Sequence, residues 1–317
     1  MKKLISYVFP IYNEAGNISL LYNTLGEIIS SIDHKYSFEL IFINDGSTDL
    51  SLEKLYKIED EDKRVVVINF ARNFGHQLAV TAGLDYANGD CVIIMDSDLQ
   101  DPPKVSLELI EKWEEGYDVV YAQRKSRKDT FFKKISANIF YWGLHRIADI
   151  DIPRNTGDFR LLDGKVVKAL NGFREHNRFL RGLVSYVGFK QTAVLFNRDE
   201  RNAGETSYPL RKMLRFAADG IFSFSSFPLK LISRLGYCIS ALSFLGILYA
   251  IIIKLSDPKV VVDGWAFTII AILLVGGVQL IVLGMLGGYI GRIYTETQNR
   301  PLYLIESIKN SRNIKKI

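Results

Sequence analysis

The stretch IIMDSDLQDPP, residues 93 to 103, is an apolar run that ends abruptly in acidic residues and proline. A second stretch, FINDGSTD at residues 42 to 49, ends in the same way. Both patterns are typical of a buried strand that carries carboxylates at its tip. Because an unpaired buried carboxylate is costly unless a positive group shares its site, the two strand tips indicate a ligand.

Short apolar runs alternate with helical patterns along the first 229 residues. Strands are expected at 5–10, 38–44, 64–70, 91–96 and 117–122, with helices between them at 14–32, 49–58, 76–87 and 103–116. Strands separated by helices of this length imply right-handed crossovers and a mostly parallel sheet with helices on both faces. The sequence therefore predicts an open α/β domain.

The composition changes near Leu229. Two stretches without charged residues follow, at 235–253 and 264–291, and each can cross about 30 Å of hydrocarbon at about 1.5 Å per residue. The alternative, a pair of buried core helices, is disfavoured because uncharged stretches of this length are rare in soluble domains. The short connection between them predicts a transmembrane hairpin.

Basic residues flank the expected hairpin on one side. Lys230 and Arg234 precede it and Arg292 follows it, whereas the connection carries two lysines balanced by two aspartates. The positive-inside rule then places the α/β domain and both termini in the cytoplasm, as parts of a multi-pass protein of the cell (inner) membrane. The apolar stretch after Met1 is too short for a cleavable signal peptide.

Two further segments, 131–147 and 210–227, mix Lys and Arg with aromatic residues, as helices in a membrane interface do. Ordinary helices that cover the sheet are the alternative for both. The net charge of +5 is too mild to suggest nucleic acid, and the position of the basic residues favours anionic lipid. Cys91 and Cys238 indicate no disulfide framework, and the four histidines show no zinc spacing. The oligomeric state stays open, with a homo-oligomer as one possibility.

The strand tips suggest a particular chemistry. In open α/β sheets, ligands bind beyond the carboxyl ends of the strands. Asp96 and Asp98 would share a face if the strand continued, and Mg²⁺ prefers one or two carboxylates together with phosphate oxygens and water. No GxGxxG or Walker-type run follows an expected strand, which disfavours dinucleotide oxidoreductases and ATPases.

These motifs together resemble the family 2 glycosyltransferases that act on polyprenyl phosphates. The resemblance rests on VFPIYNE (8–14), INDGSTD (43–49), ARNFGHQLAVTAGLDYANGD (71–90), MDSDLQDPP (95–103), GDFRLLD (157–163) and the terminal hairpin, and it covers essentially the whole chain. Bactoprenol glucosyltransferases are the closest subgroup, and dolichyl-phosphate mannosyltransferases are more distant. The resemblance implies a GT-A-type, Rossmann-like sheet followed by interface helices and the hairpin.

The resemblance also implies an organisation of the chain. A cytoplasmic nucleotide-sugar glycosyltransferase domain would span 1–206, and an amphipathic interface segment would span 207–229. Two transmembrane helices would lie within 230–292, and a cytoplasmic tail would follow at 293–317.

Residue roles follow from the same resemblance. The nucleotide sugar would be bound by residues near the first, second and fourth strands, and Asp98 and Gln100 would hold Mg²⁺ or Mn²⁺. Asp158 would act as a catalytic base or would orient the acceptor or a sugar hydroxyl; both readings stay open. In RDERNAGETSY, this chain has Thr206 and Ser207 where the family usually continues Gly-Glu with Ser-Lys. The nucleotide-sugar residues would be Pro10, Tyr12, Glu14, Asp45, Asp96 and Ser97, and the acceptor-phosphate residues Arg124, Lys133, Lys134, Ser136 and Arg201.

The expected reaction is inverting transfer of a hexose, glucose from UDP-glucose by resemblance, to undecaprenyl (bactoprenyl) phosphate. An acceptor phosphate monoester has a second pKa near about 6, so it is largely a dianion at neutral pH and needs little help as a nucleophile. Three alternatives remain: transfer of another sugar such as mannose or an aminosugar, a non-catalytic sugar-nucleotide-binding membrane scaffold, and a processive polysaccharide synthase. The last class usually carries Gln-x-x-Arg-Trp, which this sequence lacks.

Overall fold

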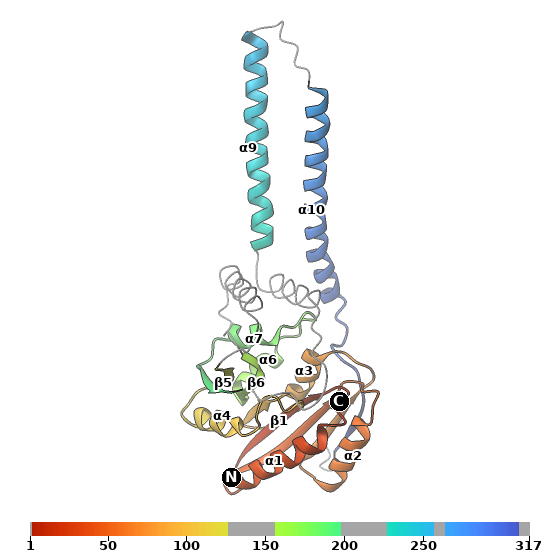
Figure 1. The fold of residues 1–317 in the computed structure, drawn as a ribbon, viewed down its shortest axis with the longest axis vertical. Coiled ribbons are helices and arrows are strands. Elements are labelled where there is room, and N and C mark those ends of the chain that lie inside the picture. Colours follow the sequence, from red (N-terminus) through yellow and green to blue (C-terminus); the bar gives the residue numbers. More distant parts are fainter. Residues whose placement is uncertain (1, 126–155, 198–226, 257–263, 311–317) are drawn as a thin grey trace.

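A computed structural model describes residues 2–125, 156–197, 227–256 and 264–310 (Figure 1). The expected amphipathic segment at 131–147 lies outside these residues, as does 207–226 of the interface segment. The elements, in chain order, are β1 (Lys3–Ile11), α1 (Ile18–Ile32), β2 (Tyr36–Asn44), α2 (Ser51–Glu61), β3 (Val65–Phe70), α3 (His76–Tyr86), β4 (Cys91–Ile94), α4 (Val105–Glu114), β5 (Val119–Arg124), β6 (Thr156–Asp163), α6 (Gly164–Asn171), α7 (Leu180–Tyr186), β7 (Gln191–Phe196), α9 (Phe227–Ser256), α10 (Trp265–Thr297) and β8 (Ile305–Lys309).

One mixed sheet organises the α/β domain. Its strand order is β7-β5-β6-β4-β1-β2-β3-β8. Strands β4, β1, β2 and β3 run parallel to one another, while β6 is antiparallel to both β4 and β5, and β8 is antiparallel to β3. The mostly parallel open sheet expected from the sequence is confirmed.

Helices cover both faces of this sheet, which explains why its central strands are apolar along their whole length. On one face, Tyr7 and Phe9 of β1 belong to a core that includes residues of α1, α2 and α4. On the other face, Val8 belongs to a second core with α3, α6 and α7. Successive β1 side chains thus enter opposite layers, as the period of two in a strand requires.

The helices α9 and α10 extend side by side away from the α/β domain (Figure 1). Within the described residues, one stretch, Leu274–Thr297, is long and apolar enough to cross a membrane. None of its most apolar part is buried against the rest of the protein. A shorter apolar stretch, Ile232–Gly246, lies in α9. The expected second span therefore stays a prediction.

The chain returns to the sheet after α10. Residues 305–309 form the edge strand β8, in which Ile308 pairs with Ile68 of β3. Before β8, the Tyr303 ring stacks on Phe70 with 5.1 Å between ring centroids. The region expected as a cytoplasmic tail, 293–317, thus contributes a strand to the α/β domain. Sequence analysis did not predict this strand, because apolar and polar residues do not alternate in IESIK.

Candidate active site

The carboxyl ends of β1, β2 and β4 meet at one edge of the sheet. In the register of these strands, Ile11 pairs with Asn44 and Val8 with Ile94, so the residues after each strand emerge together. The Pro10 carbonyl accepts a hydrogen bond from Ser97 Oγ at 3.5 Å. The structure therefore brings the expected nucleotide-sugar residues to one place.

Tyr12 and Glu14 lie in the loop between β1 and α1. The Tyr12 side chain is 48% exposed, and Glu14 accepts a hydrogen bond from Asn17 Nδ2 at 2.6 Å. Asn13, between them, has a φ of 55°, and its Oδ1 accepts a hydrogen bond from the Thr48 amide at 2.8 Å. The loop after β1 is thus tied to the loop after β2, and Tyr12 stays about half exposed.

Asp45 fixes the loop that leads into α3. Its carboxylate is buried and accepts hydrogen bonds from the backbone amides of Phe74 at 2.7 Å and Gly75 at 2.9 Å. Burial raises the pKa of Asp45, and these two hydrogen bonds oppose that shift. Gly75 has a φ of 100°, a conformation that favours glycine, and α3 begins at the next residue. Asp45 therefore holds the turn that directly precedes α3.

The tip of β4 carries the acidic run identified in the sequence. Ser97 is buried, and the Gln100 amide donates to Asp98 Oδ1 at 3.1 Å, which closes a tight turn. Burial raises the pKa of Asp96 to about 6; nearby His76 opposes this shift, and neighbouring carboxylates add to it. The tip is thus a place where positive charge would be stabilised.

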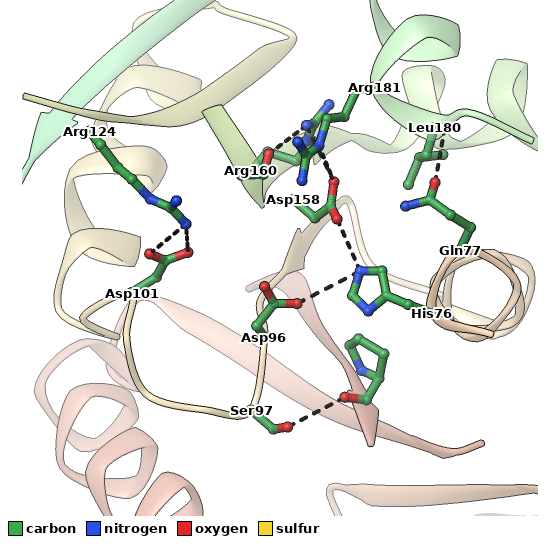
Figure 2. Close-up of polar contacts among 12 residues, drawn as sticks. His76, Gln77, Asp96, Ser97, Asp101, Arg124, Asp158, Arg160, Leu180 and Arg181 are labelled. Carbon is green, nitrogen blue, oxygen red and sulfur yellow. Dashed lines mark hydrogen bonds and ion pairs between the residues drawn. The ribbon is translucent and has the colours of Figure 1, made fainter. Parts of the chain in front are cut away.

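Asp158 is buried and lies in β6 at the centre of a polar cluster (Figure 2). Its Oδ1 is 2.7 Å from Arg181 Nε and 3.9 Å from Arg160 Nη2. Its Oδ2 is 3.0 Å from His76 Nε2, which in turn lies 3.8 Å from Asp96 Oδ1. One cluster therefore joins the tip of β4 to β6, α3 and α7.

Protonation in this cluster follows from its charges. Burial alone would raise the pKa of Asp158, but Arg181 and His76 outweigh it and hold the pKa well below its usual range. Burial would lower the pKa of His76, but the hydrogen bond to Asp158 and the charge of Asp96 reverse the effect and raise it. Burial lowers the pKa of Arg160 to about 10. Asp158 is therefore an ionised carboxylate held among cations.

Arg124 ends β5 and lies beside the β4 tip. Its Nη2 is 3.3 Å from Asp101 Oδ1, and both side chains are largely buried (Figure 2). Gly157 leaves space for this pair, because a Cβ at that position would lie 3.3 Å from Arg124 Nη2. Of the expected acceptor-phosphate residues, Arg124 is in the site, whereas Lys133, Lys134, Ser136 and Arg201 lie outside the described residues.

Sequence analysis assigned no role to three residues that contact Asp158, namely Arg160, His76 and Arg181. Arg160 could have been found, because it follows Asp158 by two residues in a strand and so shares its face. His76 stood within the FGHQ motif without a role. Arg181 offered no signal, since only the packing of α7 brings it to β6.

Comparison with known proteins agrees with this architecture. The family model described as Glycosyl transferase family 2 matches residues 6–170. The glycosyltransferase YkcC of Bacillus subtilis is 50% identical over 97% of this chain and 95% of its own length. The bactoprenol glucosyl transferase of Shigella phage SfX is 42% identical over 96% of this chain and 99% of its own.

A third relative is named a prophage bactoprenol glucosyl transferase homolog, from Escherichia coli K12. It is 39% identical over 96% of this chain and 99% of its own length. The resemblance noted in the sequence is thereby confirmed at both levels, family and subgroup. The family model, the relatives that align along nearly their whole lengths and the sheet with its acidic β4 tip agree with one another: the chain belongs to glycosyl transferase family 2.

Proposed function

We propose that this chain transfers glucose from UDP-glucose to undecaprenyl (bactoprenyl) phosphate, with inversion at the anomeric carbon. Two relatives named as bactoprenol glucosyl transferases, or a homolog of one, align with it along 99% of their own lengths. This end-to-end similarity includes the apolar helices as well as the α/β domain, so it supports a lipid acceptor in addition to the family chemistry.

The observation that carries the proposal is the link between the site and α10. At the end of α10, Glu296 accepts hydrogen bonds from the His176 amide at 2.8 Å and from its ring at 3.1 Å. His176 lies in the segment that leads into α7, and α7 supplies Arg181 to Asp158. These contacts connect the end of α10 with the cluster around Asp158, which supports a lipid phosphate as the acceptor.

The donor would lie at the edge formed by β1, β2 and β4. Tyr12 and Glu14 would line the nucleotide pocket with Pro10, and Asp45 would contact the base. Asp96 and Ser97 would lie against the ribose and the diphosphate. These roles come from the family resemblance, and the convergence of the three strand ends supports them.

A divalent cation, Mg²⁺ or Mn²⁺, fits the donor set at the β4 tip. Among the residues that the structure describes, no three His, Cys, Asp or Glu side chains are arranged to hold a metal by themselves. Mg²⁺ usually takes one or two carboxylates and completes its shell with substrate phosphates and water. Asp98 and Gln100 would supply that small set, and the metal would neutralise charge on the leaving diphosphate.

The protein's own task is to bring two anions together. The acceptor phosphate is already largely a dianion, so it attacks the anomeric carbon without a proton acceptor and the bond to UDP breaks on the opposite side. Cationic side chains stabilise the charge that gathers there. Arg124 would contribute from β5, and the remaining acceptor-phosphate residues would be Lys133, Lys134, Ser136 and Arg201.

The membrane arrangement is part of the proposal. Both α9 and α10 would cross the bilayer, with the α/β domain and both termini in the cytoplasm. This orientation is supported by the basic residues that flank the two helices on the side of the α/β domain, Lys230, Arg234 and Arg292. A cysteine at Ser256, introduced with Cys238→Ser, should react with an impermeant maleimide in right-side-out vesicles. Protection at Ser256, with labelling of a cysteine added after Ile317, would contradict the orientation.

The choice of sugar is tested by a substrate panel. The purified chain in lipid vesicles is offered UDP-glucose, a GDP-mannose control and a UDP-aminosugar, each with undecaprenyl phosphate. We expect lipid-linked glucose from UDP-glucose alone. Faster transfer of mannose or the aminosugar would replace glucose in the proposal, and nucleotide-sugar binding without any transfer would favour the scaffold alternative.

A further inference from the structure

The contacts of Asp158 are those of a residue that holds neighbouring side chains in place. Both carboxylate oxygens have cationic or ionisable partners, with Arg181 and Arg160 on Oδ1 and His76 on Oδ2. The Asp158 side chain is 6% exposed. A general base works best with a pKa near the operating pH, whereas these partners hold the pKa of Asp158 well below its usual range. The phosphate acceptor also has no proton that must be removed.

His76 has a different position in the same cluster. Its backbone is fixed by the loop that Asp45 holds through the amides of Phe74 and Gly75. Its ring is fixed by Asp158, and the side chain is still 41% exposed. The imidazole is therefore held at Nε2 by Asp158, while part of the side chain stays exposed to solvent.

The ring also spans two parts of the site. Asp96 follows β4, where the donor would bind. Asp158 lies in β6 and contacts Arg181 of α7, the helix that follows His176, which contacts the end of α10. His76 Nε2 lies 3.8 Å from Asp96 Oδ1 and 3.0 Å from Asp158 Oδ2, between the two carboxylates (Figure 2). Without the imidazole, two carboxylates would face each other across this gap and repel.

We propose that His76 is a positioning residue for sugar transfer, which bridges Asp96 and Asp158 and so sets the distance between the donor and acceptor sides of the site. Asp158 acts in this arrangement as the anchor of His76 and Arg181. The inference rests on the proposed function, because it assigns the β4 side to the donor and the β6 side to the lipid phosphate.

Two substitutions of His76, by Gln and by Asn, place the same amide group at different distances from the backbone and so test this positioning role. His76→Gln has the length to donate a hydrogen bond to Asp158, whereas His76→Asn is one methylene shorter and does not reach it. We expect His76→Asn to lower kcat by about 10²-fold, the effect of displacing reacting groups by about 1 Å. His76→Gln should keep a kcat at least about tenfold above that of His76→Asn, with little change in KM for UDP-glucose in either variant.

The assay uses the full chain in vesicles with UDP-glucose and undecaprenyl phosphate. His34→Ala, at an exposed position after α1, controls for loss of a histidine and should match the wild type. Equal kcat values for the Asn and Gln variants, or a difference confined to KM for UDP-glucose, would overturn the inference. If the wild type transfers no glucose, the proposed function fails separately, and the same two variants are compared with the sugar nucleotide that the panel identifies.

Discussion

Asp158 shows how strongly one buried carboxylate can organise a site. It receives side chains from three elements: His76 from α3, Arg160 from β6 and Arg181 from α7. Removing one partner from a buried ion pair costs about 3–5 kcal/mol, because the remaining charge is left uncompensated. Replacement of Asp158 should therefore lower the stability of the α/β domain as well as turnover.

The first prediction concerns the pH dependence of that stability. The folded-state pKa of Asp158 lies below its ordinary value. Its stabilisation is therefore complete above the unfolded pKa of about 4 and is lost as the pH falls through the folded pKa. We compare His76→Gln/Asp96→Asn with His76→Gln/Asp96→Asn/Asp158→Asn, because the His76 imidazole and the Asp96 carboxyl group would otherwise titrate in the same pH range.

The difference in Tm between these two proteins should stay constant from pH 8 to pH 5 and narrow only at lower pH. Asp33→Asn, at an exposed site, should change Tm little at any pH. A difference that narrows between pH 8 and pH 6 would mean that Asp158 titrates near neutrality, as a general base would.

Individual site residues were predictable where a strand presented them. Asp96, Asp98 and Asp45 stood out because each follows an apolar run, and the parallel register then brought the strand ends together. The sequence could not foresee that Asp45 would hold the loop before α3. Nor could it foresee Arg181, whose place depends on how a short helix packs far along the chain.

At the scale of elements, predictability followed length and hydrophobicity. Strands β1 to β5 were found because they are apolar runs between helical patterns. Strand β6 was recognised only as a motif, since its buried face carries Asp158 and Arg160 where an apolar residue would be expected. Strand β8 is short and stands on the sheet edge, so its sequence reads as an ordinary polar segment.

The second prediction tests how the segment after α10 is held. The Tyr303 hydroxyl donates to Asp85 Oδ2 at 2.7 Å, and its ring stacks on Phe70. Tyr303→Ala removes both interactions, worth about 2 kcal/mol together. Amides of 305–309 should then exchange at least about tenfold faster, because the edge strand opens locally.

Tyr303→Phe is the matched variant, because it keeps the ring and loses only the hydroxyl. It should show a much smaller increase at the same amides, and neither variant should alter exchange in β1 or β2. Equal exchange at 305–309 in Tyr303→Ala and the wild type would mean that pairing with β3 alone holds the strand.

At the scale of the whole molecule, the apolar helices and the α/β domain are joined at two places. The chain returns from α10 to the sheet edge at β8, and His176 contacts Glu296 at the end of α10. The sequence predicted the two parts but not this return, because long-range pairing leaves no local pattern. The site is thereby fixed relative to the end of a candidate membrane helix.

A transfer assay with Asp98→Ala tests whether this arrangement performs lipid glucosylation. Purified full-length protein in vesicles receives labelled UDP-glucose and undecaprenyl phosphate, with Mg²⁺ or Mn²⁺, and the label in extracted lipid is measured. We predict lipid-linked glucose with the wild type and with the exposed control Asp33→Ala, and a rate at least about 10²-fold lower with Asp98→Ala, because a catalytic metal contributes several kcal/mol. Wild-type protein that leaves the lipid unlabelled, or Asp98→Ala protein that labels it at the wild-type rate, would contradict this assignment.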